Sequence, residues 1–330
     1  MQAVILAAGK STRTYPLTLA RPKPLLKAAN KTILGHNLDN LNGFVDEVIL
    51  VVGYKKNMIK NYFGNKYKRI RLKYVEQKEQ LGTGHAVSIV EPYIKGRFIL
   101  MMGDDIYSKK DIKNCIEHKY SILTTKVDNP QNFGVVTEKN GILVDFIEKP
   151  KTFVSSLANA AFYCLDKKIF SYIRQIKKSE RNEFEMPDAI KLLLKDREIH
   201  CIKASQWLPI AYPWDLLRAD KILRKNKNLI GKNSKIKGKV INSSIGDNCT
   251  INGTVKHSIV MNNSAIAKNS IVKDSVIGEN VYFSGKIISI KKFGTVIADN
   301  VRAKNVIINS GCKIWPNKKI SNKKITADII

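Results

Sequence analysis

The sequence lacks the features that would place it in a membrane or in an oxidising compartment. No apolar run reaches the ~20 residues that a membrane-spanning helix needs. The apolar start, residues 1–8, has no basic region of the kind that opens a signal peptide. The five cysteines are odd in number and widely spaced without a C-x-x-C pair, so neither a disulfide framework nor a zinc site is indicated. We therefore expect a cytoplasmic protein with no membrane association.

Acidic residues are also scarce. The chain has 57 Lys and Arg against 28 Asp and Glu, which gives a net charge of +29 and an isoelectric point near 9.8. Such a charge raises the question of nucleic-acid binding. However, the basic residues are spread along the chain and are not interleaved with aromatic residues, as a stacking platform would require. We expect a lysine-rich solvated surface, anionic small-molecule substrates and no nucleic-acid partner.

The 330 residues are enough for one large domain and a smaller one. In the first 224 residues, short apolar runs bounded by turns alternate with helical stretches, which predicts a mostly parallel sheet covered on both faces. The predicted strands are residues 3–7, 47–52, 70–75, 98–102, 121–127, 133–137, 144–147 and 160–165. The predicted helices are residues 34–41, 56–63, 82–89, 187–195 and 213–224.

The pattern changes after residues 225–228. Helical periodicity stops, and apolar residues recur every six positions, as at Val260, Ile266 and Val272. A six-residue period is typical of a parallel β-helix, in which each coil contributes three short strands. About four to five coils fit between residues 229 and 320, with residues 284–294 as an inserted loop. The alternative is an irregular all-β tail with chance periodicity.

Residues 6–26, LAAGKSTRTYPLTLARPKPLL, carry the clearest chemical signal. An apolar strand leads into a loop of small residues, whose backbone N–H groups can approach phosphate oxygens. Arg13 and Lys23 add two cations suited to a triphosphate. Prolines on both sides of Lys23 restrict the backbone around it. The segment predicts an anion-binding loop, and the alternative is a tight turn with surface charges.

This stretch resembles the signature of the sugar-1-phosphate nucleotidyltransferase family, whose pattern is roughly L-A-A-G-x-G-T-R-L-x-P-L-T followed by P-K-P. The resemblance extends over essentially the whole of residues 1–224, because later motifs of the family recur in order. They are E-Q-L-G-T-G-H-A at 79–86, G-D-D at 103–105, F-G-V-V at 133–136, E-K-P at 148–150 and W-D-L at 214–216. The resemblance implies an enzyme that joins a sugar 1-phosphate to a nucleoside triphosphate and releases pyrophosphate.

The resemblance also implies a role for individual residues. Asp104 and Asp215 would hold Mg²⁺, a hard cation that takes a few carboxylates and bridges phosphates. Arg13 and Lys23 would stabilise the α-phosphate and the departing pyrophosphate, and Lys149 would hold the attacking sugar phosphate. Transfer of this kind depends mainly on positioning and charge neutralisation.

The remaining implied contacts are to the base and to the sugar. Gln77 can read the Watson–Crick edge of a pyrimidine through its paired donor and acceptor. The full nucleotide-binding set is Leu6, Ala8, Gly9, Lys10, Ser11, Thr12, Arg13, Lys23, Gln77, Gly82 and Thr83. The sugar-phosphate set is Gly134, Glu148, Lys149 and Asn159.

Some of these residues have a plain structural alternative. Asp104 could form a turn, Asp215 could cap its helix, and Asn159 could satisfy buried backbone. Ser11 stands where the family usually has glycine, which the loop tolerates if the φ of Ser11 is negative. Ala160 replaces the glycine that often follows the sugar-binding asparagine, which leaves the identity of the sugar open.

The expected fold is therefore a Rossmann-like α/β domain at residues 1–224, followed by a left-handed parallel β-helix of hexapeptide repeats at residues 225–330. The handedness comes from the resemblance, because the usual crossover rule is right-handed. The chain is most similar to archaeal-type bifunctional enzymes that pair a nucleotidyltransferase with a β-helical acyltransferase. This implies UTP and N-acetylglucosamine 1-phosphate as first-choice substrates, with dTTP and glucose 1-phosphate as alternatives. It also implies a trimer-type homo-oligomer.

The acyltransferase half is predicted to be inactive. The chain keeps D-S-V-I-G at 274–278, but the run in which related enzymes carry a basic histidine reads Ala267-Lys268-Asn269. A lysine with its ordinary pKa of about 10.4 stays protonated at neutral pH and is a poor general base. His257 lies about one coil earlier. The alternative for this half is residual acetyltransferase activity. For the whole chain, the alternative is a non-catalytic regulatory subunit of the same fold, which would usually lack Arg13, Lys23 or the metal carboxylates.

Overall fold

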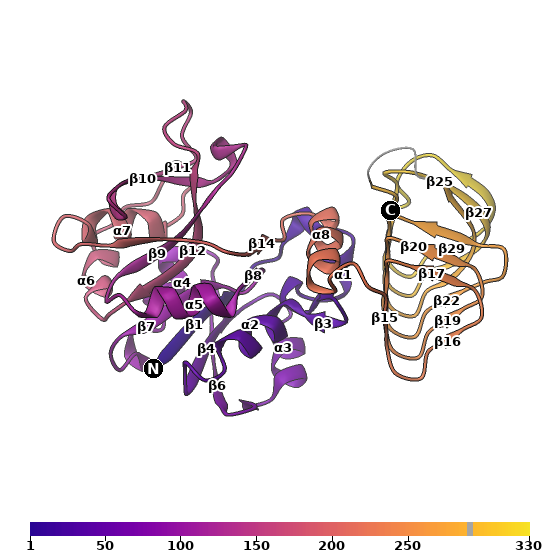
Figure 1. Ribbon diagram of the computed structural model, residues 1–330, viewed down its shortest axis with the longest axis horizontal. Helices are drawn as coiled ribbons and strands as arrows, with labels where there is room; N and C mark the ends of the chain where they lie inside the picture. The colour runs from indigo at the N-terminus through magenta and orange to yellow at the C-terminus, as the bar shows by residue number, and fades with distance from the viewer. Residues whose placement is uncertain (289–292) are drawn as a thin grey trace. The chain divides into compact units, whose positions relative to one another are not determined.

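The computed structural model describes residues 1–288 and 293–330. Contacts between residues divide the chain into two compact units (Figure 1). Unit 1 comprises residues 1–9 and 34–207, and unit 2 comprises residues 10–33 and 208–330. The signature segment is thus divided after Gly9: its strand belongs to unit 1, and the residues from Lys10 onward belong to unit 2.

Unit 1 is built on a ten-stranded sheet. In spatial order its strands are β10 (Gly134–Lys139), β11 (Ile142–Glu148), β13 (His200–Lys203), β9 (Ser121–Lys126), β12 (Leu157–Leu165), β7 (Phe98–Met102), β1 (Gln2–Ala7), β4 (Glu47–Val52), β6 (Ile70–Glu76) and β5 (Lys66–Tyr67). The adjacent strands β7, β1, β4 and β6 run parallel. This is the Rossmann-like part of the unit.

The rest of the sheet corrects the expectation of a mostly parallel arrangement. Strand β12 runs antiparallel to both of its neighbours, and β10 and β11 form a hairpin. The hairpin turn is Asn140-Gly141, with φ of 53° and 79°. A two-residue Asn-Gly turn with positive φ at both positions matches the twist of an antiparallel pair, so the sheet is mixed.

Helices accompany the sheet of unit 1. They are α2 (Ile33–Leu41), α3 (Lys56–Phe63), α4 (Thr83–Ser88), α5 (Lys109–Ile116), α6 (Ile169–Ile173) and α7 (Met186–Leu193). Strands β1 and β4 are apolar almost throughout and buried on both faces, as parallel strands covered by helices should be. One large core joins Val4 and Ile49 of the sheet to Val87 of α4 and Ile190 of α7.

Unit 2 contains the signature loop and the C-terminal strands. Residues 10–33 form two short turns, η1 (Thr12–Thr14) and η2 (Lys23–Leu25), the helix α1 (Leu17–Ala20) and the strand pair β2 (Lys27–Ala28) and β3 (Lys31–Thr32). Helix α8 (Pro213–Leu223) belongs to the same unit. The described residues between 229 and 330 form a stack of parallel strands that we call the strand stack.

Two parallel sheets make up the strand stack. One has the order β15 (Leu229–Ile230), β18 (Ser244–Ile245), β21 (Ile259–Val260), β24 (Val276–Ile277), β26 (Val296–Ile297) and β28 (Lys313–Ile314). The other contains β16 (Lys235–Ile236), β19 (Thr250–Ile251), β22 (Ala265–Ile266), β25 (Tyr282–Ile288), β23 (Ile271–Lys273), β20 (Thr254–Lys256), β17 (Lys239–Ile241), β27 (Arg302–Asn309) and β29 (Lys319–Ile325). This arrangement is consistent with a β-helix.

Aliphatic side chains and asparagine corners hold the stack together. Ile245, Val260 and Ile277 are fully buried and lie in register. At one corner, asparagines with φ of 56° to 65° follow one another, and their side chains hydrogen-bond from coil to coil, as in Asn300 Nδ2 to Asn317 Oδ1 at 3.0 Å. Asparagine enters this left-handed region more readily than other residues with a side chain, so it suits a repeated sharp corner.

Three details of the stack differ from the expectation. Residues in register are 15, 17 or 20 positions apart, whereas three hexapeptides would need about 18. The first sheet has six strands, more than the four to five coils expected, because the shorter coils leave room for another. The predicted loop at 284–294 was wrong at its start, since β25 extends to Ile288, and residues 289–292 lie outside the described residues.

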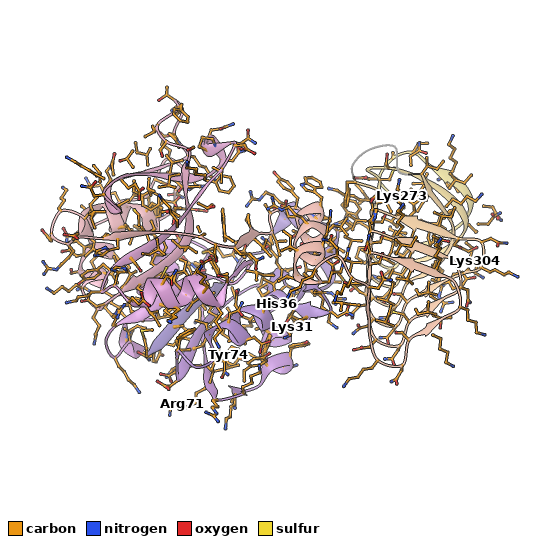
Figure 2. All side chains as sticks on the ribbon, in the orientation of Figure 1. Lys31, His36, Arg71, Tyr74, Lys273 and Lys304 are labelled. Atoms are coloured by element: carbon orange, nitrogen blue, oxygen red, sulfur yellow. The ribbon has the colours of Figure 1, made fainter. Side chains whose placement is uncertain are left out.

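Three features of the structure relate to the composition: the exposed lysines, the cysteines and the hydrophobicity of the helices. Lysines such as Lys31 and Lys304 project into solvent (Figure 2). All five cysteines are buried and free. Among the residues that the structure describes, none of the helices combines the length and the hydrophobicity of a membrane span.

Candidate functional site

The carboxyl edge of the four parallel strands collects the predicted residues of unit 1. Ala8 follows β1, Gln77 follows β6, and Asp104 comes two residues after β7. These positions are tied together by the backbone: Gln77 N–H donates to Val52 O at 2.9 Å, and Tyr54 N–H donates to Ala8 O at 3.0 Å. In open α/β sheets, ligands bind outside the carboxyl ends of the strands.

Glycines allow the strand ends to approach closely. A Cβ on Gly53 would lie 2.8 Å from Ala8 O, and a Cβ on Gly103 would lie 2.9 Å from Leu6 O. Leu6 and Ala8 are themselves buried. Their side chains therefore support the sheet edge. We expect the backbone that follows them, and not these side chains, to contact a nucleotide.

The loop at residues 9–13 has the features of an anion site. Gly9, Lys10, Thr12 and Arg13 are exposed. Within the described part of the chain, no backbone N–H group of residues 9–13 donates a hydrogen bond. Successive amides in such a turn form a concavity that binds anions, so this loop can receive phosphate oxygens.

Ser11 does not meet the condition of a negative φ that was set for it. Its φ is 53° and its ψ is 54°, the left-handed conformation that a glycine would take there. Neighbouring hydroxyls support this conformation, since Thr14 Oγ1 and Thr18 Oγ1 both donate to the Ser11 carbonyl oxygen, at 2.7 and 2.9 Å. Left-handed residues other than glycine are costly and concentrate at functional sites.

The two predicted triphosphate cations have different surroundings. Arg13 is exposed, and its guanidinium carbon lies 5.8 Å from the ring centroid of Tyr212, within unit 2. Lys23 is only 4% exposed and opens the turn η2 between two prolines. A buried lysine needs an anionic or polar partner, whereas an exposed arginine on an aromatic ring is held loosely and can meet a ligand.

Gln77 is oriented by its own loop. The side chain is 6% exposed, and its Nε2 donates to Gly82 O at 3.2 Å and lies 3.2 Å from His85 Nδ1. Because a carbonyl can only accept, the amide nitrogen must face Gly82. Among the described residues no hydrogen bond reaches Gln77 Oε1, which leaves an acceptor for a ligand.

Gly82 and Thr83 shape the same loop. Gly82 has a φ of 101°, and a Cβ there would lie 2.5 Å from Phe184 O. Thr83 Oγ1 accepts from Met186 N–H at 2.9 Å, and Gln80 Nε2 donates to Ala8 O at 2.8 Å. The loop is thus fastened to the start of α7 and to the end of β1.

The predicted metal carboxylates lie in different units. Asp104 is half-buried in unit 1, and the neighbouring Asp105 accepts from Trp207 Nε1 at 2.9 Å. Asp215 in unit 2 uses Oδ2 to accept from the backbone of Ala211 and Tyr212, at 3.0 and 2.8 Å. Asp215 therefore does cap α8, as the structural alternative anticipated, and no hydrogen bond from a described residue reaches its Oδ1.

The donor set suits a hard divalent cation. The described residues contain no group of three or more His, Cys, Asp and Glu that would form an all-protein metal cage. Mg²⁺ usually takes one or two carboxylates, keeps waters and completes its shell with substrate phosphates. The carboxylate of Asp104 and the free oxygen of Asp215 are each donors of this kind.

The predicted sugar-phosphate residues gather at the hairpin of unit 1. Gly134 pairs with Glu148, and a Cβ on Gly134 would lie 2.6 Å from Glu148 Oε2. Lys149 is exposed and has a φ of 44°, a strained conformation. Burial raises the pKa of the Glu148 carboxyl above its ordinary value of 4.5, and the charges of Lys149 and Arg181 oppose that rise.

The Asn159 side chain has structural partners. Its Oδ1 accepts from Ala161 N–H at 2.8 Å, and its Nδ2 donates to Tyr163 Oη at 2.7 Å. Ala161 has a φ of 52°, and the pairing of β12 with β9 shifts register here. Asn159 thus stabilises a bulge, while the second hydrogen of its Nδ2 stays available to a sugar hydroxyl.

One charged residue was missed by the sequence analysis. Arg181 lies 3.4 Å from Glu148 and 2.8 Å from Glu185. It is a second cation, after Lys149, beside the predicted sugar-phosphate residues. Arg181 also precedes Phe184, whose carbonyl accepts from Gly84 N–H at 2.7 Å. The segment 181–186 therefore links the loop of Gln77 to the hairpin. Its i,i+4 Arg–Glu pair just before a helix was the available signal.

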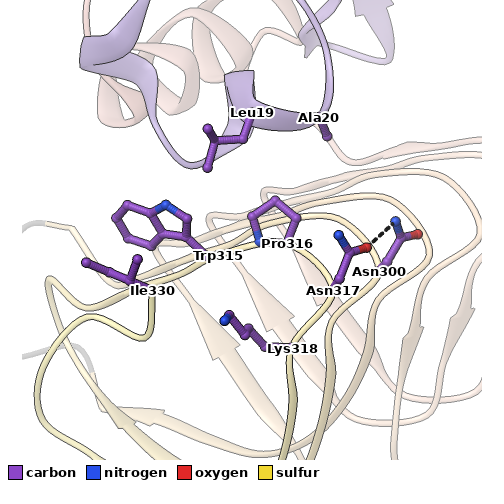
Figure 3. Close-up of a pocket in the computed structure, with 8 residues that line it drawn as sticks. All are labelled: Leu19, Ala20, Asn300, Trp315, Pro316, Asn317, Lys318 and Ile330. Carbon is purple, nitrogen blue, oxygen red and sulfur yellow. Dashed lines mark hydrogen bonds between the residues drawn. The ribbon is translucent and has the colours of Figure 1, made fainter.

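The predicted site residues form three groups. In unit 1 they are the strand ends with Gln77, Gly82, Thr83 and Asp104, and the hairpin group with Gly134, Glu148, Lys149 and Asn159. In unit 2 the group comprises residues 10–13, Lys23 and Asp215. A cavity of about 440 Å³ in unit 2, lined by residues such as Leu19, Trp315 and Lys318, includes none of them (Figure 3).

Comparison with known proteins matches two family models to the chain. The family model described as "Nucleotidyl transferase" matches residues 2–226, and the model described as "GMPPB C-terminal domain" matches residues 219–330. The chain is 42% identical to the "Bifunctional protein GlmU" of Methanocaldococcus jannaschii over 249 residues, which cover 73% of this chain and 60% of that protein. The chain thus spans less than two thirds of the length of this relative.

Two further proteins match over nearly their whole length. The "UTP--glucose-1-phosphate uridylyltransferase AglF" of Haloferax volcanii is 35% identical over 236 residues, which cover 68% of this chain and 97% of that protein. A solved Bacillus anthracis structure, assigned as a glucose-1-phosphate thymidylyltransferase, superposes with a TM-score of 0.62 at 26% identity. It covers 69% of this chain and 97% of its own.

Proposed function

The chain belongs to the nucleotidyl transferase family, and from that premise we propose that it is a sugar nucleotidyltransferase. It transfers a nucleotidyl group from a nucleoside triphosphate to a sugar 1-phosphate and releases pyrophosphate. The single observation that carries the proposal is the loop at residues 9–13, whose backbone N–H groups donate to no described residue while Arg13 and Lys23 belong to the same segment.

The reaction needs charge neutralisation more than a proton transfer. An oxygen of the sugar phosphate attacks the α-phosphorus, the bond to the β-phosphate bridging oxygen breaks, and pyrophosphate leaves with the electron pair. The attacking oxygen carries no proton, so no general base is required. The loop amides, Arg13 and Lys23 stabilise the charge on the triphosphate. Lys149 holds the sugar phosphate in place against the repulsion between the two anionic substrates.

Mg²⁺ is the proposed metal. Asp104 and Asp215 would hold it, with oxygen donors that suit a hard cation. When bound, the ion neutralises phosphate charge and withdraws electron density from the α-phosphorus. The divalent metal use that is general in the family supports this assignment.

UTP or dTTP is the proposed nucleotide. With its Nε2 turned to Gly82 and His85, Gln77 presents Oε1 as an acceptor. Uracil and thymine carry an N3–H donor at the matching position, whereas cytosine carries an acceptor there. The base methyl that separates uracil from thymine discriminates by only ~1–3 kcal/mol in an apolar pocket, so mixed use of the two triphosphates is expected.

The proposed acceptor is N-acetylglucosamine 1-phosphate or glucose 1-phosphate. Glu148 and Asn159, with Gly134 leaving room beside Glu148, would receive sugar hydroxyls. Lys149, with Arg181 near Glu148, supplies positive charge for the phosphate. The name of the AglF relative, a UTP--glucose-1-phosphate uridylyltransferase, supports an acceptor of this class.

For the C-terminal part we propose a left-handed β-helix of hexapeptide type that forms a trimer-type homo-oligomer. The parallel strands of the stack support the β-helix. The domain boundary near residue 224 is supported by the two family models, which meet at residues 219–226. The free cysteines support a reducing, cytoplasmic setting.

We also propose that the strand stack has no acetyltransferase activity. Lys268 stands where a basic histidine is needed, and His257 Nδ1 lies 3.3 Å from Asp274 Oδ1, so that its ring is already paired at a coil corner. Incubation with acetyl-CoA and glucosamine 1-phosphate should release no free thiol above the single-substrate controls. Steady release that depends on both substrates would contradict this proposal.

The main proposal is tested by pyrophosphate release. UTP, dTTP, CTP and ATP are each combined with N-acetylglucosamine 1-phosphate and with glucose 1-phosphate in the presence of Mg²⁺. Release should depend on both substrates and should be fastest with UTP or dTTP. A non-catalytic subunit would release no pyrophosphate with any pair.

A further inference from the structure

Arg21 lies in the signature segment, eight residues after Arg13 and two before Lys23, yet it faces the strand stack. Its Nη1 is 2.8 Å from Glu279 Oε1, and its Nη2 bonds Asp299 Oδ2. The residue is 9% exposed, and all three residues belong to unit 2. The arginine therefore joins the substrate-handling segment to carboxylates about 260 to 280 residues later in the chain.

The strand stack is shaped to hold this arginine. Glu279 N–H donates to Asp299 Oδ1 at 2.9 Å, which fixes the carboxylate on one coil from the next. A Cβ on Gly278 would lie 2.4 Å from the same oxygen, so the glycine leaves room for it. Burial by itself lowers the pKa of the Arg21 guanidinium, but the hydrogen bonds and charges of Glu279 and Asp299 raise it above its ordinary value.

Further along, the same segment is tied down at a second place. Ala29 N–H donates to Asp220 Oδ1 at 2.8 Å, and Asn30 Nδ2 donates to Ile245 O at 2.7 Å. Asp220 is in turn bonded to Arg224 at 2.7 Å in a fully buried pair. The segment 10–33 is thus attached both to α8, which carries Asp215, and to the strand stack.

Buried ion pairs are an inefficient way to gain stability. Removing charges from water costs about as much as their attraction returns, and apolar replacements often stabilise a protein equally well or better. What a charged trio adds is a fixed geometry, because a guanidinium bound to two carboxylates has little freedom. Along the sequence, Arg21 lies between Arg13 and Lys23, the two proposed triphosphate cations. The fixed geometry of Arg21 therefore bears on the placement of these two cations.

We propose that Arg21 is a positioning residue through which the strand stack holds Arg13 and Lys23 in place for the nucleoside triphosphate. The inference rests on the proposed function for its substrate. It gives the strand stack an indirect part in nucleotide binding, in addition to the proposed oligomerisation. Arg21 itself touches no substrate and acts only through the segment that it anchors.

The test compares five proteins: the parent, Arg21→Lys, Arg21→Met, Glu279→Gln and the control Ile266→Val. Ile266 is fully buried in the strand stack and takes no part in the ion pairs, so its variant reports on general weakening of the stack. Glu279→Gln keeps the Arg21–Asp299 pair and serves if Arg21→Met fails to fold. Each protein is measured for melting temperature, kcat and the KM of both substrates.

Arg21→Met should raise the KM for the triphosphate about tenfold or more and lower kcat, since small displacements of binding groups carry large rate costs. The KM for the sugar phosphate should change less than twofold in the same assay. Glu279→Gln should act in the same direction more weakly, and Arg21→Lys should recover part of the loss. Ile266→Val should lower the melting temperature and leave both KM values unchanged.

The inference is overturned if Arg21→Met lowers the melting temperature while the KM for the triphosphate stays at the parent value, or if both KM values rise equally. Hydrogen exchange separates this result from a failure of the proposed function. If the parent releases no pyrophosphate with any substrate pair, the function fails. The anchoring is then judged by whether amides of residues 10–33 exchange faster in Arg21→Met than in Ile266→Val, and equal exchange would overturn it.

Discussion

At the scale of single residues, the proposed chemistry depends most on Asp104. Its carboxylate lies at the carboxyl edge of the parallel strands, where a metal and the triphosphate are proposed to bind. Asp104→Asn keeps the size of the side chain and removes one charge partner. We expect kcat to fall ~10²–10³-fold with little change in melting temperature.

The neighbouring aspartate provides the control for this prediction. Asp105 accepts from Trp207 Nε1. Asp105→Asn should therefore lower the melting temperature and leave kcat close to the parent value. Turnover by Asp104→Asn within a few-fold of the parent at saturating Mg²⁺ would remove Asp104 from the metal site.

Ser11 gives a second prediction at this scale. Its left-handed backbone costs about 1–2 kcal/mol for a residue with a side chain, and the Thr14 and Thr18 hydroxyls offset part of that cost. Ser11→Gly should keep kcat/KM within a few-fold of the parent, because glycine enters this region freely. Ser11→Val should lower kcat/KM for the triphosphate, because a branched side chain disfavours the conformation further.

Steady-state kinetics and thermal melting of the two Ser11 variants check this account. Val at this position should affect the triphosphate more than the sugar phosphate. Equal activity of Ser11→Gly and Ser11→Val would mean that the loop does not need the left-handed residue.

Glu148 gives a pH dependence. Its pKa lies above the ordinary 4.5 because of burial, so the folded state holds this proton at pH values where the unfolded state has lost it. Stability from this group therefore falls as pH rises through the window from 4.5 to the raised pKa. Below the raised pKa the carboxyl is neutral and a weaker acceptor for a sugar hydroxyl.

The expected result is that KM for the sugar phosphate rises as pH is lowered into this window, and that Glu148→Gln shows a flatter profile. Comparing the two profiles removes the ionisation of the sugar phosphate itself, which both proteins share. Parallel profiles for the parent and the variant would show that Glu148 does not contact the sugar.

At the scale of elements, the loop of Gln77 depends on Gly82. A Cβ there would meet Phe184 O at 2.5 Å, and the φ of 101° is unfavourable for any other residue. Gly82→Ala should move the loop away from α7, raise KM for UTP and narrow the preference for UTP over ATP. Gly96→Ala is the matched control, because a Cβ at Gly96 meets nothing within 4 Å.

A four-way competition among triphosphates measures the preference for both glycine variants. Gly96→Ala should retain the parent ranking. If Gly82→Ala also retains it, the loop does not read the base.

Elements with a simple burial pattern could be predicted from the sequence. Strands β1, β4 and β7 are almost fully buried apolar runs, and they were predicted within a residue. Helix α5 was missed because it is mostly polar, and α6 and β13 were missed because they have only five and four residues. The asparagine corners were missed as well, because a ladder depends on which residues lie in register between coils.

The site shows the same division. Glycine, lysine and aspartate positions could be found from motifs, since the resemblance fixed their order along the chain, and family membership is confirmed. The ion pairs of Arg21 could not be found, because they depend on contacts between distant segments. Arg181 had only its i,i+4 partner Glu185 as a local signal, and serine at position 11 does not by itself indicate a left-handed φ. Arg21 and Asp299 are separated by 278 positions.

At the scale of the whole molecule, the strong positive charge and the fold are consistent with anionic substrates. The excess of lysine and arginine is spread over both units, which favours the approach of anionic substrates. Activity should therefore decline as salt is raised, through a higher KM for the triphosphate.

The most direct measurement follows pyrophosphate and the sugar nucleotide together in one reaction of the protein with UTP, N-acetylglucosamine 1-phosphate and Mg²⁺. We expect equal amounts of the two products, formed only when both substrates are present. Formation of both products should be lost in Asp104→Asn. Glucose 1-phosphate and dTTP are tested in the same way. Absence of pyrophosphate with every pair, or release of inorganic phosphate in its place, would contradict the account.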